Sequence, residues 1–246
     1  MLETIKRWFS SASGSHWSGA EEWAKARGLS FKRSRDGEGF VIDAAQPGGV
    51  GWRLEWGPSL RPYIEGPELR LRADTASDID LQMLILSRSL MDAMEKTVFE
   101  QFTEDLQTRI DTATPEEMRW LVLFPKLPPQ ELKMLRDSFG AVAPSPRWVA
   151  QWIEGPLSAQ LQQARASWLA PEDPMALILQ RGRLTLRTSL RQPDAAALTA
   201  AVGLFEVALR EAKRVIQHFN ENGIASTQPF MWTGLPGAGD DGLGGH

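Results

Sequence analysis

The residue types that most often carry enzyme chemistry are scarce in this chain of 246 residues. Cysteine is absent, which excludes disulfides, thiolate nucleophiles and every cysteine-based metal site. The three histidines, His16, His218 and His246, lie so far apart in the chain that we do not expect them to converge. His218 falls near the end of a long predicted helix, a position that the helix dipole explains better than catalysis does. We therefore expect neither a metal ion nor a cofactor.

Carboxylates could still bind a hard cation, and the segment DTASDID supplies Asp74, Asp78 and Asp80. This segment lacks the glycine and the terminal glutamate of a calcium loop, so we interpret it as a solvated linker. Neighbouring acids such as Glu116 and Glu117 fall on predicted helix surfaces, where charge runs are usually solvated. The chain contains no GxxxxGK[ST] loop, no GxGxxG between a strand and a helix, and no GxSxG elbow. A pair of catalytic carboxylates far apart in sequence, as in glycosidases, would leave no local signature.

Arginine is the charged residue with the most distinctive distribution. Residues 74–117 hold eleven acidic and three basic residues, whereas the last predicted hairpin carries arginine and no acid. If the leucines of this hairpin and of ELRLR face the core, their arginines share the open face of a sheet. Such a face suits an acidic protein surface, an anionic lipid or nucleic acid, or it is a solvated face that an acidic helix neutralises. The candidate interaction surface consists of Arg70, Arg72, Arg181, Arg183, Arg187 and Arg191.

Alternating and continuous apolar runs predict the strands that carry these arginines. In GWRLEWG, Trp52, Leu54 and Trp56 alternate with charged residues, which indicates one buried face and one solvated face. Turn signals at Asp36-Gly37 and around Gly182 predict hairpins over residues 29–45 and 175–190. Runs with little polarity predict further strands over residues 81–87 and 119–125. Pro62 cannot donate to a central ladder, so the strand after it is expected at a sheet edge, and residues 139–146 are expected to be an extended link.

Helical periodicity and capping signals account for most of the remaining chain. The longest helix has a core stripe of leucine, valine and phenylalanine, and a Gly155-Pro156 pair should interrupt another helix. Because the strands come in antiparallel pairs with helices after them, the sequence predicts an α+β fold. This fold would be an antiparallel sheet packed by long amphipathic helices. Two similar strand–helix units are one alternative for its organisation, and the sequence leaves open whether the two halves share one core. The helices are predicted over residues 18–27, 87–106, 130–139, 147–169 and 194–219.

Composition and break signals divide the chain into four predicted parts. The first is a short amphipathic segment that would dock on its own domain, a partner or a membrane surface through residues 1–13. Two α+β units and a glycine-rich tail that we expect to be mostly disordered follow. Ten tryptophans against one tyrosine supply either core bulk or an aromatic binding surface. The predicted boundaries are 1–17, 18–125, 126–223 and 224–246.

Two stretches of the chain carry a resemblance to known sequences. SRSLMDAMEKTVFEQFTEDLQTRIDTATPEEMRWLVLFPK, together with GFVID and WRLEWGPSLRPYIEGPELRLR, resembles a family of uncharacterised bacterial cytosolic proteins. Residues 137–190, with GPLSAQL and GRLTLR, resemble a domain of unknown function found in membrane-proximal bacterial proteins. Neither resemblance implies a catalytic residue or a cofactor. The first implies a bacterial protein of the cytoplasm.

These observations favour a non-catalytic interaction or scaffold module. No apolar run reaches the roughly 18 residues of a membrane span and no signal peptide is evident, so we expect a cytoplasmic protein. The net charge of −4 does not predict nucleic-acid binding, and an unknown protein partner is expected instead. The alternatives are an enzyme that acts on an anionic small molecule through carboxylates and arginines, and a protein that associates peripherally with a membrane.

Overall fold

The computed structural model describes residues 17–44, 51–77, 79–104 and 115–221, with side chains described outside 101–104. The predicted amphipathic segment and the predicted disordered tail lie outside the described residues, apart from Trp17. Asp78, His16 and His246 also lie outside them.

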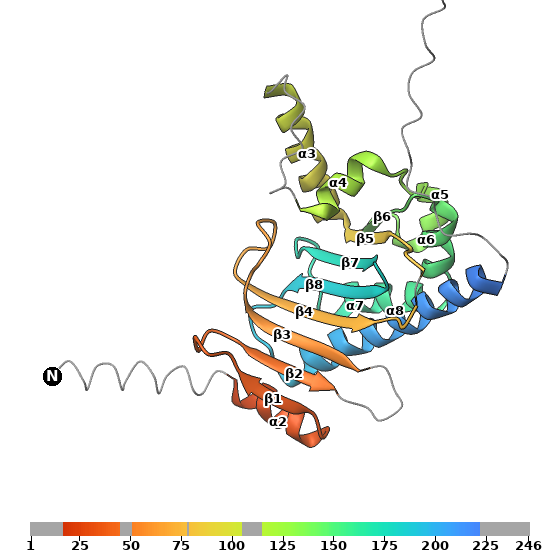
Figure 1. Cartoon of the computed structure of the whole chain (residues 1–246). Helices are drawn as coiled ribbons and strands as arrows, with labels where there is room; N and C mark the ends of the chain where they lie inside the picture. The colour runs from red at the N-terminus through yellow and green to blue at the C-terminus, as the bar shows by residue number, and fades with distance from the viewer. Residues whose placement is uncertain (1–16, 45–50, 78, 105–114, 222–246) are drawn as a thin grey trace, which may run out of the picture.

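The described strands form one antiparallel sheet with the order β1-β2-β3-β4-β8-β7-β5-β6, which confirms the predicted α+β class (Figure 1). Strand β5 from the first predicted unit pairs with β6 and β7 from the second, so strands of both units share this sheet. The strands are β1 Ser30–Arg33, β2 Phe40–Ala44, β3 Trp52–Pro58, β4 Pro67–Asp74, β5 Met83–Ser87, β6 Phe139–Val142, β7 Met175–Gln180 and β8 Arg183–Ser189.

Helices cover one face of the sheet completely and the other only in part. Helices α2, α6, α7 and α8 pack on the face that carries Leu54, Leu71 and Leu186, where they form the main core. Helices α3 and α4 cover only the β7, β5 and β6 side of the opposite face, through Leu84, Leu86 and their neighbours. The helices are α2 Ser18–Ala26, α3 Arg88–Glu104, α4 Glu116–Leu123, α5 Pro129–Leu132 with the 3₁₀ turn Lys133–Leu135, α6 Pro146–Ile153, α7 Pro156–Ser167 and α8 Ala195–Glu221.

Several local predictions were wrong, each because a local rule was overridden. The helix predicted over residues 130–139 is only α5 with the 3₁₀ turn Lys133–Leu135, because Phe139 already begins β6. The apolar run at 119–125 is mostly the helix α4, which buries Trp120 and Leu121 but leaves Val122 exposed. A short apolar run does not by itself distinguish strand from helix. Strand β4 is central rather than an edge, because Pro62 lies in the loop before it. Residues 139–142 form the strand β6 instead of a link.

The tryptophans are core residues in the described part of the chain. Seven of the eight described tryptophans are buried, and Trp168 is half-buried. Several donate their indole N–H to a fixed partner, as Trp56 does to the carbonyl of Leu190 at 2.7 Å and Trp152 to that of Ala208 at 2.9 Å. The interpretation of tryptophan as core bulk is therefore confirmed for these residues, and they do not form an exposed aromatic surface.

Two glycines give a matched prediction about the backbone. Gly182 lies in the β7–β8 turn with φ of 68°, and a Cβ there would come within 2.7 Å of the Ser77 carbonyl oxygen. Gly182→Ala should therefore lower the free energy of unfolding by more than about 1 kcal/mol. Gly203 lies inside α8 with open space around it, so Gly203→Ala should raise stability by about 0.5–1 kcal/mol. Equal urea midpoints for the two variants would contradict the different backbone roles of Gly182 and Gly203.

Candidate binding face

The face of the sheet that α3 and α4 leave open carries arginines in cross-strand rows. We call the described side chains on this side of β2, β3, β4 and β8 the open face. In the register of the sheet, Arg70 on β4 lies between Glu55 on β3 and Arg187 on β8. The next row places Arg72 beside Arg53. Since like charges opposite each other destabilise a sheet, these rows need carboxylates to hold them.

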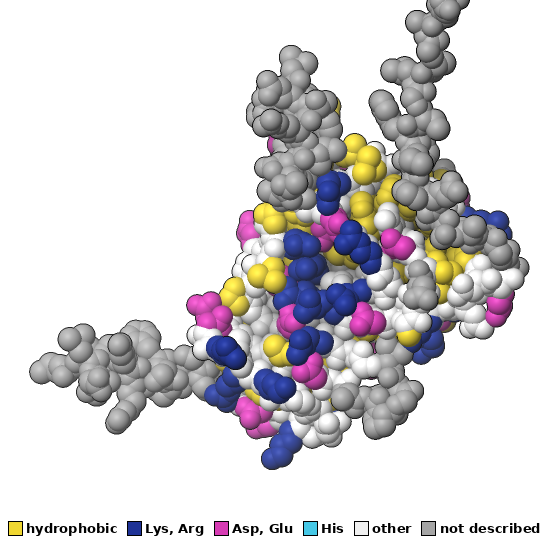
Figure 2. All heavy atoms as spheres, viewed as in Figure 1, with side chains coloured by type: hydrophobic (Ala, Val, Ile, Leu, Met, Phe, Trp, Pro, Cys, Tyr) yellow, Lys and Arg dark blue, Asp and Glu magenta, His cyan; other side chains and the backbone are white. Residues whose placement is uncertain are grey.

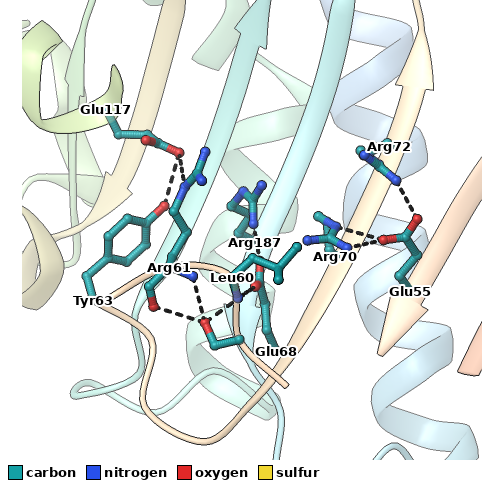
Figure 3. A network of polar contacts seen from close by, with 10 residues as sticks. Glu55, Leu60, Arg61, Tyr63, Glu68, Arg70, Arg72, Glu117 and Arg187 are labelled. Atoms are coloured by element: carbon teal, nitrogen blue, oxygen red, sulfur yellow. Dashed lines mark hydrogen bonds and ion pairs between the residues drawn. The ribbon is translucent and has the colours of Figure 1, made fainter. Parts of the chain in front are cut away.

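Glu55 neutralises the centre of the open face. Its carboxylate accepts hydrogen bonds from Arg70, with Nε at 2.9 Å, and from Arg72 (Figure 3). Burial raises the pKa of Glu55, but the hydrogen bond and charge of Arg70, together with Arg72, outweigh burial and place the pKa below its ordinary 4.5. Glu55 is therefore ionised at neutral pH and holds two guanidinium groups on the open face.

A second carboxylate, Glu68, holds Arg187 and an adjacent loop. The Glu68 side chain is 2% exposed and that of Arg187 is 10% exposed, so their ion pair is buried. The same carboxylate accepts the backbone N–H of Leu60 at 2.9 Å and the hydroxyl of Ser59 at 3.4 Å. Glu68 therefore fixes the loop between β3 and β4 against the sheet, as Figure 3 shows.

The tip of this loop contacts helix α4 through a third carboxylate. Glu117, which is buried, accepts a hydrogen bond from Arg61 Nε at 3.2 Å and from the Tyr63 hydroxyl at 3.1 Å. Burial, and next the charge of Glu117, raise the pKa of Tyr63 far above its ordinary value. Tyr63 is therefore a hydrogen-bond donor at neutral pH and not a base.

A hollow of about 370 Å³ lies between α4, the tip of the loop and strands β7 and β8. Two further hollows, of about 250 and 480 Å³, lie over β2, β3 and β4. The arginines that line the three hollows are Arg53, Arg61, Arg70, Arg72, Arg181, Arg183 and Arg187. The carboxylates that line them are Asp36, Asp43, Glu55, Glu68, Asp74, Glu116 and Glu117. Because these numbers are equal, the linings of the three hollows together carry many guanidinium groups without a net charge. Figure 2 shows the Lys and Arg side chains gathered along the middle of this side of the molecule, with Asp and Glu side chains among them.

The structure brings together four of the six arginines singled out from the sequence. Arg70, Arg72, Arg183 and Arg187 share the open face. Arg181 lies in the β7–β8 turn and lines the 370 Å³ hollow, where its guanidinium is 3.9 Å from the Glu116 carboxylate. Arg191 is exposed beyond the end of β8 and forms no ion pair with any residue that the structure describes.

Sequence reasoning missed the residues that hold these arginines in place. Period-two spacing could have found Glu55 and Glu68, because they share a face with Arg53 and Arg70 along β3 and β4. Nothing in the sequence indicated that Arg61 would meet Glu117 across 56 residues.

The acidic segment DTASDID supports the arginine hairpin in the described residues. Asp74 accepts a hydrogen bond from Arg183 Nε at 2.9 Å, and Asp80 accepts one from the backbone N–H of Arg181 at 2.7 Å. Within the described ranges, no three side chains of the metal-binding types lie close enough together to hold an ion. The interpretation of this segment as a solvated linker therefore needs correction, since two of its acids contact the hairpin.

The lowered pKa of Glu55 predicts a defined acid sensitivity. A carboxylate whose pKa is lower in the folded state contributes stability above its unfolded value and loses it as the pH falls. Wild-type stability should therefore decline as the pH falls below about 4.5, and Glu55→Gln should remove part of that slope. Urea unfolding at several pH values across this range measures the slope of stability against pH. Glu65→Gln, which changes an exposed carboxyl, is the control. Identical slopes for wild type and Glu55→Gln would contradict the role of Glu55.

Comparison with known proteins identifies no relative: no protein-family model, curated protein or solved structure matches the chain. The resemblance to bacterial cytosolic proteins thus stays an expectation from the sequence. Among the helices in the described ranges, none combines the length and apolar character needed to cross a membrane.

Proposed function

We propose that this protein is a non-catalytic binding module whose open face engages an acidic segment of a protein partner. The observation that carries the proposal is the unequal exposure of the ion pairs. The side chain of Arg72 is 36% exposed and that of its partner Glu55 is 17% exposed, and Arg53 is likewise more exposed than Asp43. The pair of Arg183 with Asp74 is the opposite case, since Asp74 is 72% exposed and Arg183 is 57% exposed. A partner would therefore meet the guanidinium groups of Arg53 and Arg72 above their carboxylates, and Arg183 with its carboxylate beside it.

The ion pairs leave most of the guanidinium donors available to a partner. A guanidinium carries five N–H donors, and Arg72 gives one of its nitrogens to Glu55 while Arg183 gives Nε to Asp74. The remaining donors can bind a carboxylate in the two-point geometry that arginine favours. The internal carboxylates hold the guanidinium groups in place, which reduces the entropy lost on binding.

The sheet itself gives a second reason to assign a use to this face. Two rows place arginines opposite each other, Arg53 with Arg72 and Arg70 with Arg187. Such pairs disfavour the fold relative to alternating charges or apolar pairs. Local features that conflict with stability concentrate at functional sites.

The test is affinity capture from the native host with mass spectrometry. The variant Arg72→Glu/Arg183→Glu reverses two exposed charges on the open face, and Arg147→Glu/Arg210→Glu makes the same change on α6 and α8, which pack on the opposite face. Arg187 is left unchanged because it is buried. We expect a partner with an acidic segment that wild type and the control retain and the open-face variant loses. Equal capture by all three proteins would contradict the proposal.

A second candidate, an enzyme acting on an anionic small molecule, is favoured by one observation. Glu116 and Glu117 line the same hollow as Arg61, Arg181 and Arg187. An enzyme would convert a compound from a metabolite extract, and Glu117→Gln would abolish that conversion. Conversion that survives this substitution would exclude Glu117 as the catalytic group.

The location and the membrane alternative also stay proposals. The cysteine-free composition supports a reducing compartment such as the cytoplasm of a bacterium. Peripheral membrane association would depend on residues 1–13. Liposome flotation that is unchanged by deleting those residues would contradict it.

A further inference from the structure

The hollow of about 480 Å³ over β3 and β4 has two arginines directly opposite each other in its lining. Arg53 on β3 is paired in register with Arg72 on β4, and both line this hollow. Side chains that face each other across antiparallel strands have Cβ atoms about 4.5–5.5 Å apart, so the two like charges oppose each other. The side chains of Arg53 and Arg72 are 50% and 36% exposed, so a molecule in solvent can reach both.

The carboxylates that neutralise these two arginines do not lie between them. Asp43 on β2, on the far side of Arg53 from Arg72, accepts from Arg53 Nε at 2.8 Å and from Nη2 at 3.2 Å. Glu55, in the next row, accepts from Nη2 of Arg72 and also from Arg70. Among the described residues, no carboxylate contacts both Arg53 and Arg72. Each guanidinium therefore keeps terminal N–H donors that no internal carboxylate uses.

The charges that line this hollow leave one positive charge in excess. Its lining contains three arginines and two aspartates, which include Arg183 and Asp74 beside the pair. Arg183 is matched by Asp74, whereas Arg72 shares the carboxylate of Glu55 with Arg70. One added carboxylate would bring the lining to zero charge. A doubly charged phosphate group would instead leave it negative, next to the exposed carboxylate of Asp74.

We infer that the acidic segment of the partner is anchored by one aspartate or glutamate side chain, whose carboxylate binds between Arg53 and Arg72. This inference rests on the proposed function and names the group that its binding face recognises. A carboxylate has two oxygens, so each oxygen can accept from one guanidinium, and the bound anion separates the two like charges. Because internal carboxylates already hold both guanidinium groups, binding costs little side-chain entropy.

The test measures binding of three peptides to the full chain at one fixed ionic strength. The peptides are blocked glycine pentapeptides that carry glutamate, glutamine or phosphoserine at the central position. Titrations followed through the arginine side-chain Nε–H signals in NMR spectra report both the affinity and the arginines involved. We expect the glutamate peptide to shift the signals of Arg53 and Arg72 and to bind at least about tenfold more tightly than the glutamine peptide.

Two results of these titrations would overturn the inference. Equal binding of the glutamate and glutamine peptides, or shifts confined to other arginines, would show that no carboxylate binds between Arg53 and Arg72. Tighter binding of the phosphoserine peptide than of the glutamate peptide would show that the pair recognises a phosphate group instead of a carboxylate.

Single substitutions then place the carboxylate. Arg53→Gln and Arg72→Gln each remove one of the two opposed charges and should weaken binding of the glutamate peptide about tenfold. Arg33→Gln is the matched control, because Arg33 is 52% exposed and paired with Glu21 of α2 rather than lining the hollow. It should bind the peptide as wild type does. Wild-type affinity in both Arg53→Gln and Arg72→Gln would overturn the inference.

Affinity capture from the native host separates a failure of this inference from a failure of the proposed function. A partner that Arg72→Glu/Arg183→Glu loses but Arg53→Gln retains in full would reject the anchor between Arg53 and Arg72 and leave the proposed function standing. Equal capture by wild type and Arg72→Glu/Arg183→Glu would reject the proposed function itself.

Discussion

Replacing Arg187 by methionine should lower the free energy of unfolding by about 3–5 kcal/mol, since it removes one partner of a buried ion pair. The substitution leaves the carboxylate of Glu68 buried without its cation. Glu68 also holds the backbone N–H of Leu60, so the loop between β3 and β4 should loosen in the same variant. Urea unfolding at neutral pH measures the first effect, and hydrogen exchange at Leu60 measures the second.

The control for this prediction is a double substitution. Arg187→Met/Glu68→Gln removes both charges, and the glutamine can still accept from Leu60, so most of the lost stability should return. Arg191→Met, at an exposed arginine two residues beyond the strand, should change stability by no more than about 0.5 kcal/mol. A loss below about 1 kcal/mol for Arg187→Met would show that the pair is accessible to water.

Replacing Trp152 by alanine should also cost about 3–5 kcal/mol, the range expected when a large aromatic side chain is removed from a core. Trp152 on α6 is completely buried and donates its indole N–H to the Ala208 carbonyl on α8 at 2.9 Å. The substitution opens a cavity between α6 and α8 and deprives that carbonyl of its side-chain donor. Denaturant unfolding followed by circular dichroism measures the loss.

Trp168, which is half-buried at the end of α7, gives the comparison. Trp168→Ala removes a side chain of the same size but less buried area, so its cost should be clearly smaller. An equal loss of unfolding free energy in the two variants would mean that α6 and α8 collapse into the cavity left by Trp152. That result would contradict a rigid core.

The fold class could be predicted because the strongest sequence signals were local. Alternation in β3 and the turn at Gly182 depend on neighbours in the chain, and both predictions were confirmed. The errors arose where partners far apart in sequence decide the structure. Strand β6 forms because it pairs with β5, and α4 is a helix whose apolar run packs against β5 and β7 on one side only.

The candidate site was predictable only in part. The spacing of the arginines in β4 and β8 could place them on one face of the sheet. It could not predict which of them would be buried. Arg187 and Arg183 are four residues apart on the same strand, yet Arg187 is buried and Arg183 is exposed, because the 59–66 loop and Glu68 enclose only the first. The ion pair between Arg61 and Glu117 depends on how α4 packs over the sheet. No local sequence pattern encodes that packing.

The most direct test of the proposed binding face is photo-crosslinking from a single position. A photoreactive residue in place of Thr185, which lies on β8 opposite Arg72 of the open face, should capture the partner through an acidic segment that mass spectrometry can map. The same residue in place of Arg210, which is exposed on α8 across the sheet, should capture nothing comparable. Capture from position 210 but not from 185, or crosslinks to segments without acidic residues, would contradict the assignment of the open face.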